Sequence, residues 1–347
     1  MPDEPVHILD LDRSALIARL VAEGLEPYRA DQVLEWVYRR RARSFDGMTN
    51  LGKVVRQRLA ENMVVYASRV ERRQEADDGT FKLLLRWADG QASECVMIPQ
   101  ASRRTACVST QAGCAVGCTF CASGQGGLGR NLTVGEIVEQ AMQIGQHLPV
   151  GERVTHVVFM GIGEPLANYD AVVSAIRTMN AEWGMNIGAR RITVSTVGLP
   201  GAIRKLAREG LQIGLAISLH APNDALRRQL VPWAANVSID ELVRAARDYF
   251  DTTGREVTLE YVLLAGVNDR PGDARALTAL AKRMRCNVNL IRYNPVEGLP
   301  YQRPSSQTAY RFATALRQGG VNVHIRPSRG VQIEAACGQL RRQQSDL

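Results

Sequence analysis

Two kinds of hydrophobic spacing divide this chain. Up to about residue 62, apolar residues recur three and four positions apart, as they do along one face of a helix. The helices predicted from this spacing are 12–25, 28–43 and 49–63. Two strand-like runs follow, and the Asp89-Gly90 pair between them is typical of a hairpin turn. Residues 1–98 are therefore predicted to form a helical accessory domain plus a β-hairpin, with the third helix beginning at a Thr or Asn cap.

From Thr105 onward, short apolar runs alternate with helical segments. Repeated strand–helix units predict a parallel sheet, which is either doubly wound or curved toward a barrel. The strand-like runs are 105–110, 154–161, 191–198, 213–221, 257–266, 287–294 and 321–327. Helical patterns separate them, and the clearest of these are 133–147, 200–210 and 238–254.

Chemically unusual residues follow the ends of nearly all these strands. Three cysteines come after the first strand, and GIGEP (161–165) ends the second. SLH (218–220) ends the fourth strand, and Asn294 ends the sixth. Barrel enzymes place their reactive groups at the C-terminal ends of the strands, where all of them open onto one face. This distribution favours an α/β barrel for residues 99–347.

Length, apolar runs and charge narrow the class of protein. No stretch of the 347 residues approaches the ~18 consecutive apolar residues of a membrane helix. The N-terminus, MPDEPVHILD, has neither the apolar core of a signal peptide nor an Arg-rich transit pattern, so we expect a soluble cytoplasmic protein. The net charge of +8 suits a polyanionic partner such as nucleic acid, although basic clusters are more often solvated helix faces. The clusters contain Arg39, Arg40, Arg41, Arg43, Arg103, Arg104, Arg341 and Arg342.

The seven cysteines are an odd number in a chain without a secretion signal, which argues against a structural disulfide framework. Cys114, Cys118 and Cys121 lie within eight residues, on a loop flanked by glycines. A zinc site would need a fourth ligand, and the nearest thiol is Cys107. The C-x3-C-x2-C spacing instead favours a [4Fe-4S] cluster held by three thiolates, whose fourth iron is open to S-adenosylmethionine (SAM). Cys286, at a predicted strand start, is interpreted as buried filler.

These cysteines, with Phe120 before the third, resemble the radical-SAM superfamily. MGIGEPL (160–166) resembles that superfamily's GGE-type motif, which implies that backbone carbonyls and Glu164 accept hydrogen bonds from the SAM amino group. GQGGLG (124–129) formally matches a dinucleotide-binding motif, but no strand directly precedes it. We interpret it as flexible backbone that shapes the cluster loop.

A narrower resemblance covers nearly the whole chain. RTACVSTQAGCAVGCTFCASG, GRNLT, MGIGEPLANYD, ITVSTVG, AISLHAPND, LEYVLLAGVND, NLIRYNP and AACGQL are similar to the RlmN/Cfr family of radical-SAM RNA adenine methyltransferases. PYRADQVLEWVY and FDGMTNLGKVVRQRL resemble that family's helical RNA-binding appendage. The resemblance implies an incomplete (β/α) radical-SAM barrel. In its RlmN branch, it implies methylation of carbon 2 of an adenine in 23S rRNA and of the adenine beside the anticodon in some tRNAs.

The same resemblance implies roles for two further cysteines. Adenine carbon 2 is too electron-poor to attack a SAM methyl group directly, and the family uses two SAM molecules per turnover. The first methylates a cysteine that matches Cys337, and the second yields a radical that takes a hydrogen from the S-methyl group. The resulting carbon adds to the ring, and a second cysteine, matching Cys107, attacks the thioether sulfur and leaves a disulfide to be reduced. An isolated cysteine is otherwise more often buried filler.

Glu94 matches the family's general base, which removes the ring proton. From the residues alone, the alternative is a solvent-facing glutamate on the hairpin. Strand alternation places Glu94 on the face of Val96 and Ile98, opposite Cys95 and Met97, so neither face is plainly the solvent-exposed one. His220 is otherwise a histidine packed at a strand end. The positions that the resemblance assigns to SAM binding are Gly163, Glu164, Ser195, Ser218, Leu219, His220 and Asn294.

One position departs from the family pattern, since Gln332 in RGVQIEAACGQL stands where an aspartate is common. We expect this to alter how the Cys337 loop is anchored. Two rival functions remain open: a Cfr-like enzyme that methylates carbon 8 of the same adenine, and a non-enzymatic RNA-binding protein with zinc on Cys107 and the three clustered cysteines. From the family, the reductant expected is flavodoxin, and we expect a monomer with no membrane partner.

Overall fold

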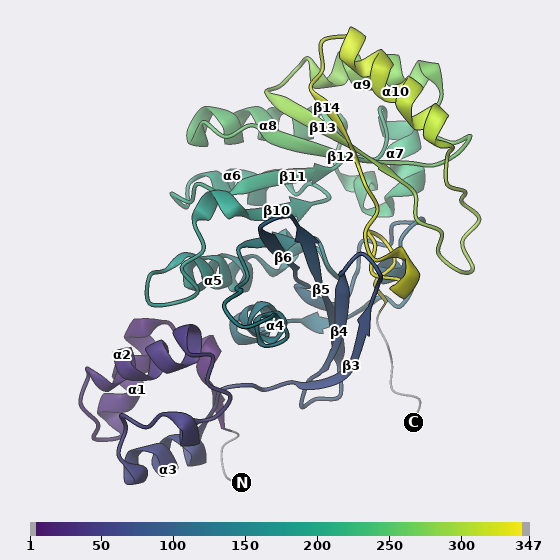
Figure 1. Cartoon of the computed structure of the whole chain (residues 1–347). Helices are drawn as coiled ribbons and strands as arrows, with labels where there is room; N and C mark the ends of the chain where they lie inside the picture. The colour runs from purple at the N-terminus through teal and green to yellow at the C-terminus, as the bar shows by residue number, and fades with distance from the viewer. Residues whose placement is uncertain (1–4, 342–347) are drawn as a thin grey trace.

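The computed structural model describes residues 5–341 and shows a helical lobe beside a large curved sheet (Figure 1). The lobe is built from β1 (Val6–His7), α1 (Arg13–Ala22), α2 (Arg29–Leu34), α3 (Lys53–Asn62) and β2 (Met63–Val64). The two short strands pair in parallel and close the lobe. Three helices are thus confirmed at the predicted places, although each of them is shorter than predicted.

The prediction of one α-helix over residues 28–43 is wrong after Leu34. Regular α-helix ends at Leu34, a π-helical turn covers Glu35–Arg39, and Arg41 adopts a left-handed φ of 54°. Arg41 then donates to the backbone carbonyls of Gly145, at 2.6 Å, and Glu152. These contacts hold the chain after the helical segment against the core.

The third helix does not begin at a Thr or Asn cap. Its N-cap is Gly52, and the Asn50 side chain is engaged elsewhere because its Oδ1 accepts from Trp36 Nε1 at 2.5 Å. The Asn50 side chain therefore ties the loop before α3 to the segment after α2.

One ten-stranded sheet dominates the rest of the chain. Its order is β14-β13-β12-β11-β10-β9-β6-β5-β4-β3. The strands from β6 to β14 are parallel to one another, and β3 to β6 pair antiparallel. The strands are β3 (Arg69–Glu75), β4 (Phe81–Arg86), β5 (Ala92–Gln100), β6 (Arg103–Cys107), β9 (His156–Phe159), β10 (Ile192–Thr196), β11 (Gly214–Ser218), β12 (Val257–Leu263), β13 (Cys286–Arg292) and β14 (Val323–Arg326).

All seven strands predicted after Thr105 are confirmed, and they appear in chain order across the sheet. Within residues 5–341, β14 pairs with β13 alone, so the curved sheet stays open as an incomplete barrel. Helices pack their apolar faces against the sheet from outside (Figure 1). They are α4 (Val134–Gln146), α5 (Tyr169–Asn180), α6 (Pro200–Ala207), α8 (Ile239–Thr253), α9 (Pro271–Ala281) and α10 (Ser306–Gln318), while α7 (Asp224–Leu230) follows β11.

The predicted hairpin is confirmed as β4 and β5, which turn at Asp89 and Gly90. The sequence did not indicate β3, because its residues, RVERRQE, are mostly charged and lie at the edge of the sheet. β5 pairs with β6, so the hairpin continues the core sheet. The predicted boundary at residue 98 falls within β5, and the division into 1–98 and 99–347 stays a prediction.

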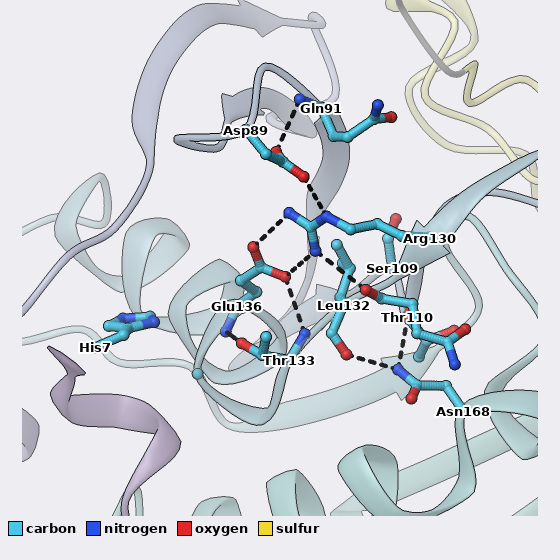
Figure 2. Close-up of polar contacts among 12 residues, drawn as sticks. His7, Asp89, Gln91, Ser109, Thr110, Arg130, Leu132, Thr133, Glu136 and Asn168 are labelled. Carbon is cyan, nitrogen blue, oxygen red and sulfur yellow. Dashed lines mark hydrogen bonds and ion pairs between the residues drawn. The ribbon is translucent and has the colours of Figure 1, made fainter. Parts of the chain in front are cut away.

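Arg130 joins the hairpin turn to the core (Figure 2). Its Nε donates to Asp89 Oδ2, and its two terminal nitrogens bind the Glu136 carboxylate at 2.7 and 2.8 Å. Glu136 also completes a capping box with Thr133 at the start of α4. Arg130 lies on β8 (Leu128–Asn131), which pairs with β7 (Gln111–Gly113). The loop between β7 and β8, which carries the three cysteines, is therefore fixed at its base.

Candidate active site

A cavity opens at the C-terminal ends of the parallel strands, where the sequence placed its reactive residues. Ten of the thirteen predicted site residues line it together. They are Cys114, Cys118, Cys121, Gly163, Glu164, Ser195, Ser218, His220, Asn294 and Cys337. The other three are Glu94, Cys107 and Leu219, and each packs close by. Four different strands and the chain's last turns thus converge on one space.

The three clustered cysteines project from the loop between β7 and β8. Gly117 turns this loop with a left-handed φ of 68°, and the backbone N–H of Cys121 donates to the Cys118 carbonyl at 3.1 Å. Burial raises the pKa of the Cys114 thiol to about 11 and raises those of Cys118 and Cys121 as well. Three thiolates in such a place need a strong positive charge bound between them.

The three thiols line one cavity, and thiolates are the ligands that an iron–sulfur cluster uses. Within residues 5–341, no three His, Cys, Asp or Glu side chains converge so as to hold a single metal ion. In a [4Fe-4S] cluster each thiolate binds a different iron, so its ligands stand around a body of eight atoms and need not meet at one point. Cys107 lies on β6 among Ile162, Ile333 and Ala335, in a cluster separate from the apolar residues around the cysteine loop.

Gly163 and Glu164 form a tight backbone corner after β9. Gly163 has a φ of 108°, and a Cβ there would lie 2.7 Å from the Gln111 Cβ. The Glu164 carboxylate accepts the N–H of Leu166 at 2.9 Å and that of Val197 at 2.8 Å. Burial nevertheless raises the pKa of Glu164 to about 7. This carboxyl is thus poised to gain its negative charge when a cation binds beside it.

The ends of β10 and β11 add hydroxyls and an imidazole. Ser195 and Ser218 lie with their Oγ atoms 3.3 Å apart. His220, at a left-handed φ of 59°, accepts the Val262 N–H on Nδ1 at 3.2 Å and meets the Phe120 ring edge-on. Burial lowers the pKa of His220 to about 3, so its ring is neutral and carries its proton on Nε2. The Leu219 side chain is buried in the core, and its backbone N–H donates to the Glu260 carbonyl at 3.0 Å.

The C-terminal segment 329–341 carries Cys337 across the cavity. Asn294 Nδ2 donates to the Cys337 carbonyl at 3.2 Å. The cysteine loop holds the next residues, because the Ala122 N–H donates to the Gly338 carbonyl at 2.8 Å and Ser123 Oγ to the Leu340 carbonyl at 2.7 Å. Cys337 is exposed toward this cavity. The surrounding protein desolvates the Cys337 thiol and thereby raises its pKa.

Cys107 packs directly under this segment, in the same apolar cluster as Ile333, Ala335 and Leu340. Burial raises the pKa of the Cys107 thiol to about 12, and the Cys337 sulfur contributes to that rise. The fold therefore brings together two thiols that are 230 positions apart in the chain. Both are free thiols in this structure.

Glu94 also lies under the C-terminal segment, and its solvent-facing interpretation is wrong. The side chain is 1% exposed, pairs with Lys82 Nζ at 2.9 Å and accepts the Arg341 N–H at 2.9 Å. Burial raises the pKa of Glu94 despite the lysine. A buried carboxyl with a raised pKa suits proton transfer.

Comparison with known proteins identifies the family of this chain. A model of the radical SAM superfamily matches residues 108–276, and a model of the ribosomal RNA large subunit methyltransferase N-terminal domain matches residues 6–65. A protein of Rhodopirellula baltica named probable dual-specificity RNA methyltransferase RlmN is 46% identical over 98% of this chain and 92% of its own length. The chain belongs to the RlmN family of radical-SAM RNA methyltransferases.

Two further proteins are similar to this chain over nearly the whole of its length. A Thermotoga neapolitana protein with the same name is 46% identical over 96% of this chain and 97% of its own. The crystal structure of a radical SAM methyltransferase from Sphaerobacter thermophilus is 47% identical, with a TM-score of 0.95 over 97% of this chain and 99% of that one. The cofactors are a [4Fe-4S] cluster and SAM. In the described part of the chain, no helix is long and apolar enough to cross a membrane.

Some residues at the RlmN-type site were missed by sequence reasoning. Glu260, in the middle of β12, lines the cavity and accepts a hydrogen bond from Asn289 Nδ2 at 2.9 Å. Burial raises the pKa of Glu260, and the nearby Arg326 acts to lower it. The sequence feature that could have indicated Glu260 is a single acidic residue inside an otherwise apolar strand, because a glutamate is rarely buried unless it is paired. Arg326 also lowers the pKa values of Cys107 and Cys337, although burial raises both overall.

Several arginines of the basic clusters already have partners within the protein. Arg39 donates to the Glu182 carbonyl at 2.8 Å, and Arg40 pairs with Glu35 at 2.8 Å while lying over the Trp36 ring. Arg104 binds the Glu152 carboxylate with two nitrogens. Arg41 is committed to the core, as described above, and Arg342 lies outside the described residues. The exposed Arg40 and Arg43 remain best placed for a solvent-side partner.

Proposed function

We propose that this protein methylates carbon 2 of a specific adenine in 23S rRNA, and of the adenine adjacent to the anticodon in tRNA, through an S-methyl group on Cys337. The relatives named RlmN support this choice through their stated dual specificity. The observation that carries the proposal is the pairing of Cys337 at the cavity with Cys107 directly beneath its loop. A radical-SAM enzyme without a methyl carrier has no use for these two thiols.

The cluster and SAM have defined places in this proposal. Cys114, Cys118 and Cys121 hold the cluster, and the SAM contacts come from Gly163, Glu164, Ser195, Ser218, Leu219, His220 and Asn294. When bound, these cofactors supply a methyl group and, after one-electron reduction, a radical that abstracts hydrogen. Glu164 contributes a carboxylate for the SAM ammonium group, which favours the ionised form of a carboxyl whose pKa is otherwise raised to about 7.

Cys337 carries the methyl group as a thioether, and its methyl carbon then forms the bond to the adenine ring. Glu94 accepts the ring proton, since it is a buried carboxyl under the same segment. Cys107 attacks the Cys337 sulfur as a thiolate and forms a Cys107–Cys337 disulfide. The bond from sulfur to the former methyl carbon breaks, its electron pair stays with that carbon, and the carbon takes up a proton to become the methyl group of the product. Two electrons from a reductant, expected to be flavodoxin, restore the thiols.

The N-terminal helices are proposed to bind the RNA. We divide the chain into two parts. Residues 1–98 form the accessory domain with the hairpin, and residues 99–347 form the barrel with the Cys337 loop. The match of residues 6–65 to an N-terminal domain of ribosomal RNA methyltransferases supports an RNA-binding role. We also propose that the enzyme acts as a monomer in the cytoplasm.

Mass spectrometry of digested RNA tests the proposal. The reconstituted enzyme is incubated separately with unmodified 23S rRNA and with unmodified tRNA. 2-Methyladenosine in either RNA supports carbon 2, and its distribution reports substrate preference. 8-Methyladenosine would assign the Cfr-like activity instead. Zinc without iron in the purified protein, together with unmodified RNA, would favour the non-enzymatic alternative.

A further inference from the structure

Arg227 is a buried guanidinium that the protein leaves largely unpaired. The residue is 1% exposed, and its Nη2 donates to the Val197 carbonyl. Its Nε and Nη1 have no hydrogen-bond partner among residues 5–341. A buried charge whose donors are unmet is costly, and native proteins retain one mainly where a partner completes it. Arg227 therefore indicates an anionic group that belongs beside it.

The position of Arg227 identifies that group. Helix α7, which carries Arg227, is held against the cysteine loop because the Thr119 N–H donates to the Leu230 carbonyl at 3.0 Å. Phe120 packs with Leu230 in one apolar cluster, and Cys118 packs against it. The Arg227 charge also acts to lower the pKa of the Cys118 thiol, although burial raises that pKa overall.

No carboxylate already satisfies this arginine in the described chain. Asp224 is the acidic residue that interacts with it, but Asp224 Oδ1 accepts the Ile239 N–H at 2.8 Å. Burial lowers the pKa of Arg227 to about 10, so the guanidinium is still charged at neutral pH. The guanidinium therefore keeps its charge on a helix held against the cysteine loop, and within the described chain no carboxylate oxygen accepts a hydrogen bond from it.

We propose that the Arg227 guanidinium offsets the negative charge of the iron–sulfur cluster on the side of Cys118. In this way Arg227 raises the reduction potential of the cluster. This inference rests on the proposed assignment of Cys114, Cys118 and Cys121 as its ligands. A [4Fe-4S] core of charge +2 on three thiolates is an anion, and one-electron reduction makes it more negative. A nearby cation stabilises the reduced form more than the oxidised form, since net charge and hydrogen bonds at sulfur set the potential.

The test compares four reconstituted full-length proteins: wild type, Arg227→Met, Arg227→Lys and Arg228→Met. Arg228 is the matched control, because it is the next residue of α7 and is exposed. Iron content is measured first, and the midpoint potential is then followed by electron paramagnetic resonance during a redox titration. We expect Arg227→Met to weaken one-electron reduction at least tenfold, a fall of about 59 mV. Arg227→Lys, which keeps the charge, and Arg228→Met are expected to stay near wild type.

Thermal unfolding gives a second readout that is independent of activity. Without iron, Arg227→Met is expected to be at least as stable as wild type, because it removes an unpaired buried charge. With the cluster bound, wild type is expected to be the more stable protein. A loaded Arg227→Met protein with an unchanged potential would overturn the inference while leaving the cysteine assignment intact. A wild-type protein that takes up no cluster would overturn the proposed function, and the inference with it.

Discussion

Gln332 and Asp77 form a two-point contact between the C-terminal segment and the turn from β3 to β4. The Asp77 N–H donates to Gln332 Oε1 at 3.2 Å, and Gln332 Nε2 donates to Asp77 Oδ2 at 2.9 Å. The neighbouring Asp78 accepts the Gly330 N–H at 3.2 Å. The amide at 332, which departs from the family pattern, therefore complements a carboxylate on the facing turn and anchors the segment that carries Cys337.

Replacing Gln332 by Asp is expected to loosen this segment. Two carboxylates would then face each other, and the donor from Nε2 would be lost, at a cost of about 1 kcal/mol. Hydrogen exchange in residues 329–341 is expected to become faster than in wild type. The matched control is the double variant Gln332→Asp with Asp77→Asn, which restores a donor opposite the new carboxylate. If the single variant exchanges like wild type, the contact does not anchor the segment.

The Glu164 carboxyl predicts a pH dependence of stability. Its pKa is raised by burial from 4.5 to about 7, so the stability it contributes is fully present below pH 4.5 and is lost as pH rises through 7. In Glu164→Gln this loss is absent. The free energy of unfolding of the variant is expected to gain on wild type by up to about 3 kcal/mol between pH 4.5 and 8.

Urea unfolding of the iron-free proteins at intervals across that pH range measures the Glu164 effect. The amide of the variant also changes the hydrogen bonds at position 164, which lowers the free energy of unfolding by the same amount at every pH. This shifts the whole plot of unfolding free energy against pH and leaves its slope unchanged. Curves for the two proteins that run parallel from pH 4.5 to 8 would show that Glu164 titrates normally.

The three clustered cysteines are expected to be individually indispensable for iron. Alanine at Cys114, Cys118 or Cys121 is predicted to remove most bound iron and all SAM cleavage, because two thiolates hold a cubane poorly. Cys286 is the matched control. It lies at the start of β13, and its Sγ is 3.5 Å from the carbonyl oxygen of Ala281. Its alanine variant is expected to keep both properties, and full iron content in a Cys118 variant would refute the ligand set.

The N-terminal arginines are expected to separate into two classes. Neutralising the exposed pair Arg40 and Arg43 is predicted to weaken RNA binding and to reduce its dependence on salt, since each neutralised phosphate releases counterions. SAM cleavage is expected to survive. Arg41→Gln is expected to lower thermal stability instead, because its guanidinium binds the Gly145 and Glu152 carbonyls. RNA affinity that is flat with salt in the wild type would contradict this account.

The sequence revealed features that repeat along the chain and concealed those that depend on distant contacts. The parallel strands were predictable because each is a short apolar run between amphipathic helices. The environment of Glu94 was not, because residues 92–97 are all buried. Helix α4 covers one face, where Cys95 Sγ meets the Gln140 carbonyl at 3.8 Å, and the C-terminal segment covers the other, where Arg341 binds Glu94.

Charge in the interior was equally hard to anticipate. In the sequence, Arg227 and Arg228 are two adjacent basic residues that follow a strand-end motif. Packing buries the first and exposes the second. The candidate site itself was easier, since the ends of parallel strands must share one edge of the sheet. Which of those residues point inward, as Ser218 does and Leu219 does not, is decided by the pleat and by the neighbouring core.

The central claim is that Cys337 carries the methyl group and Cys107 releases the product, and one comparison of two variants tests it. Cys107→Ala can still form the bond between the Cys337 thioether carbon and adenine, but no thiolate is left to break the bond to sulfur. We predict that Cys107→Ala purifies with covalently attached RNA, seen as a nuclease-sensitive shift in denaturing gels, and that Cys337→Ala does not. Normal turnover by both variants, or an absence of both adduct and activity loss in Cys107→Ala, would contradict the account.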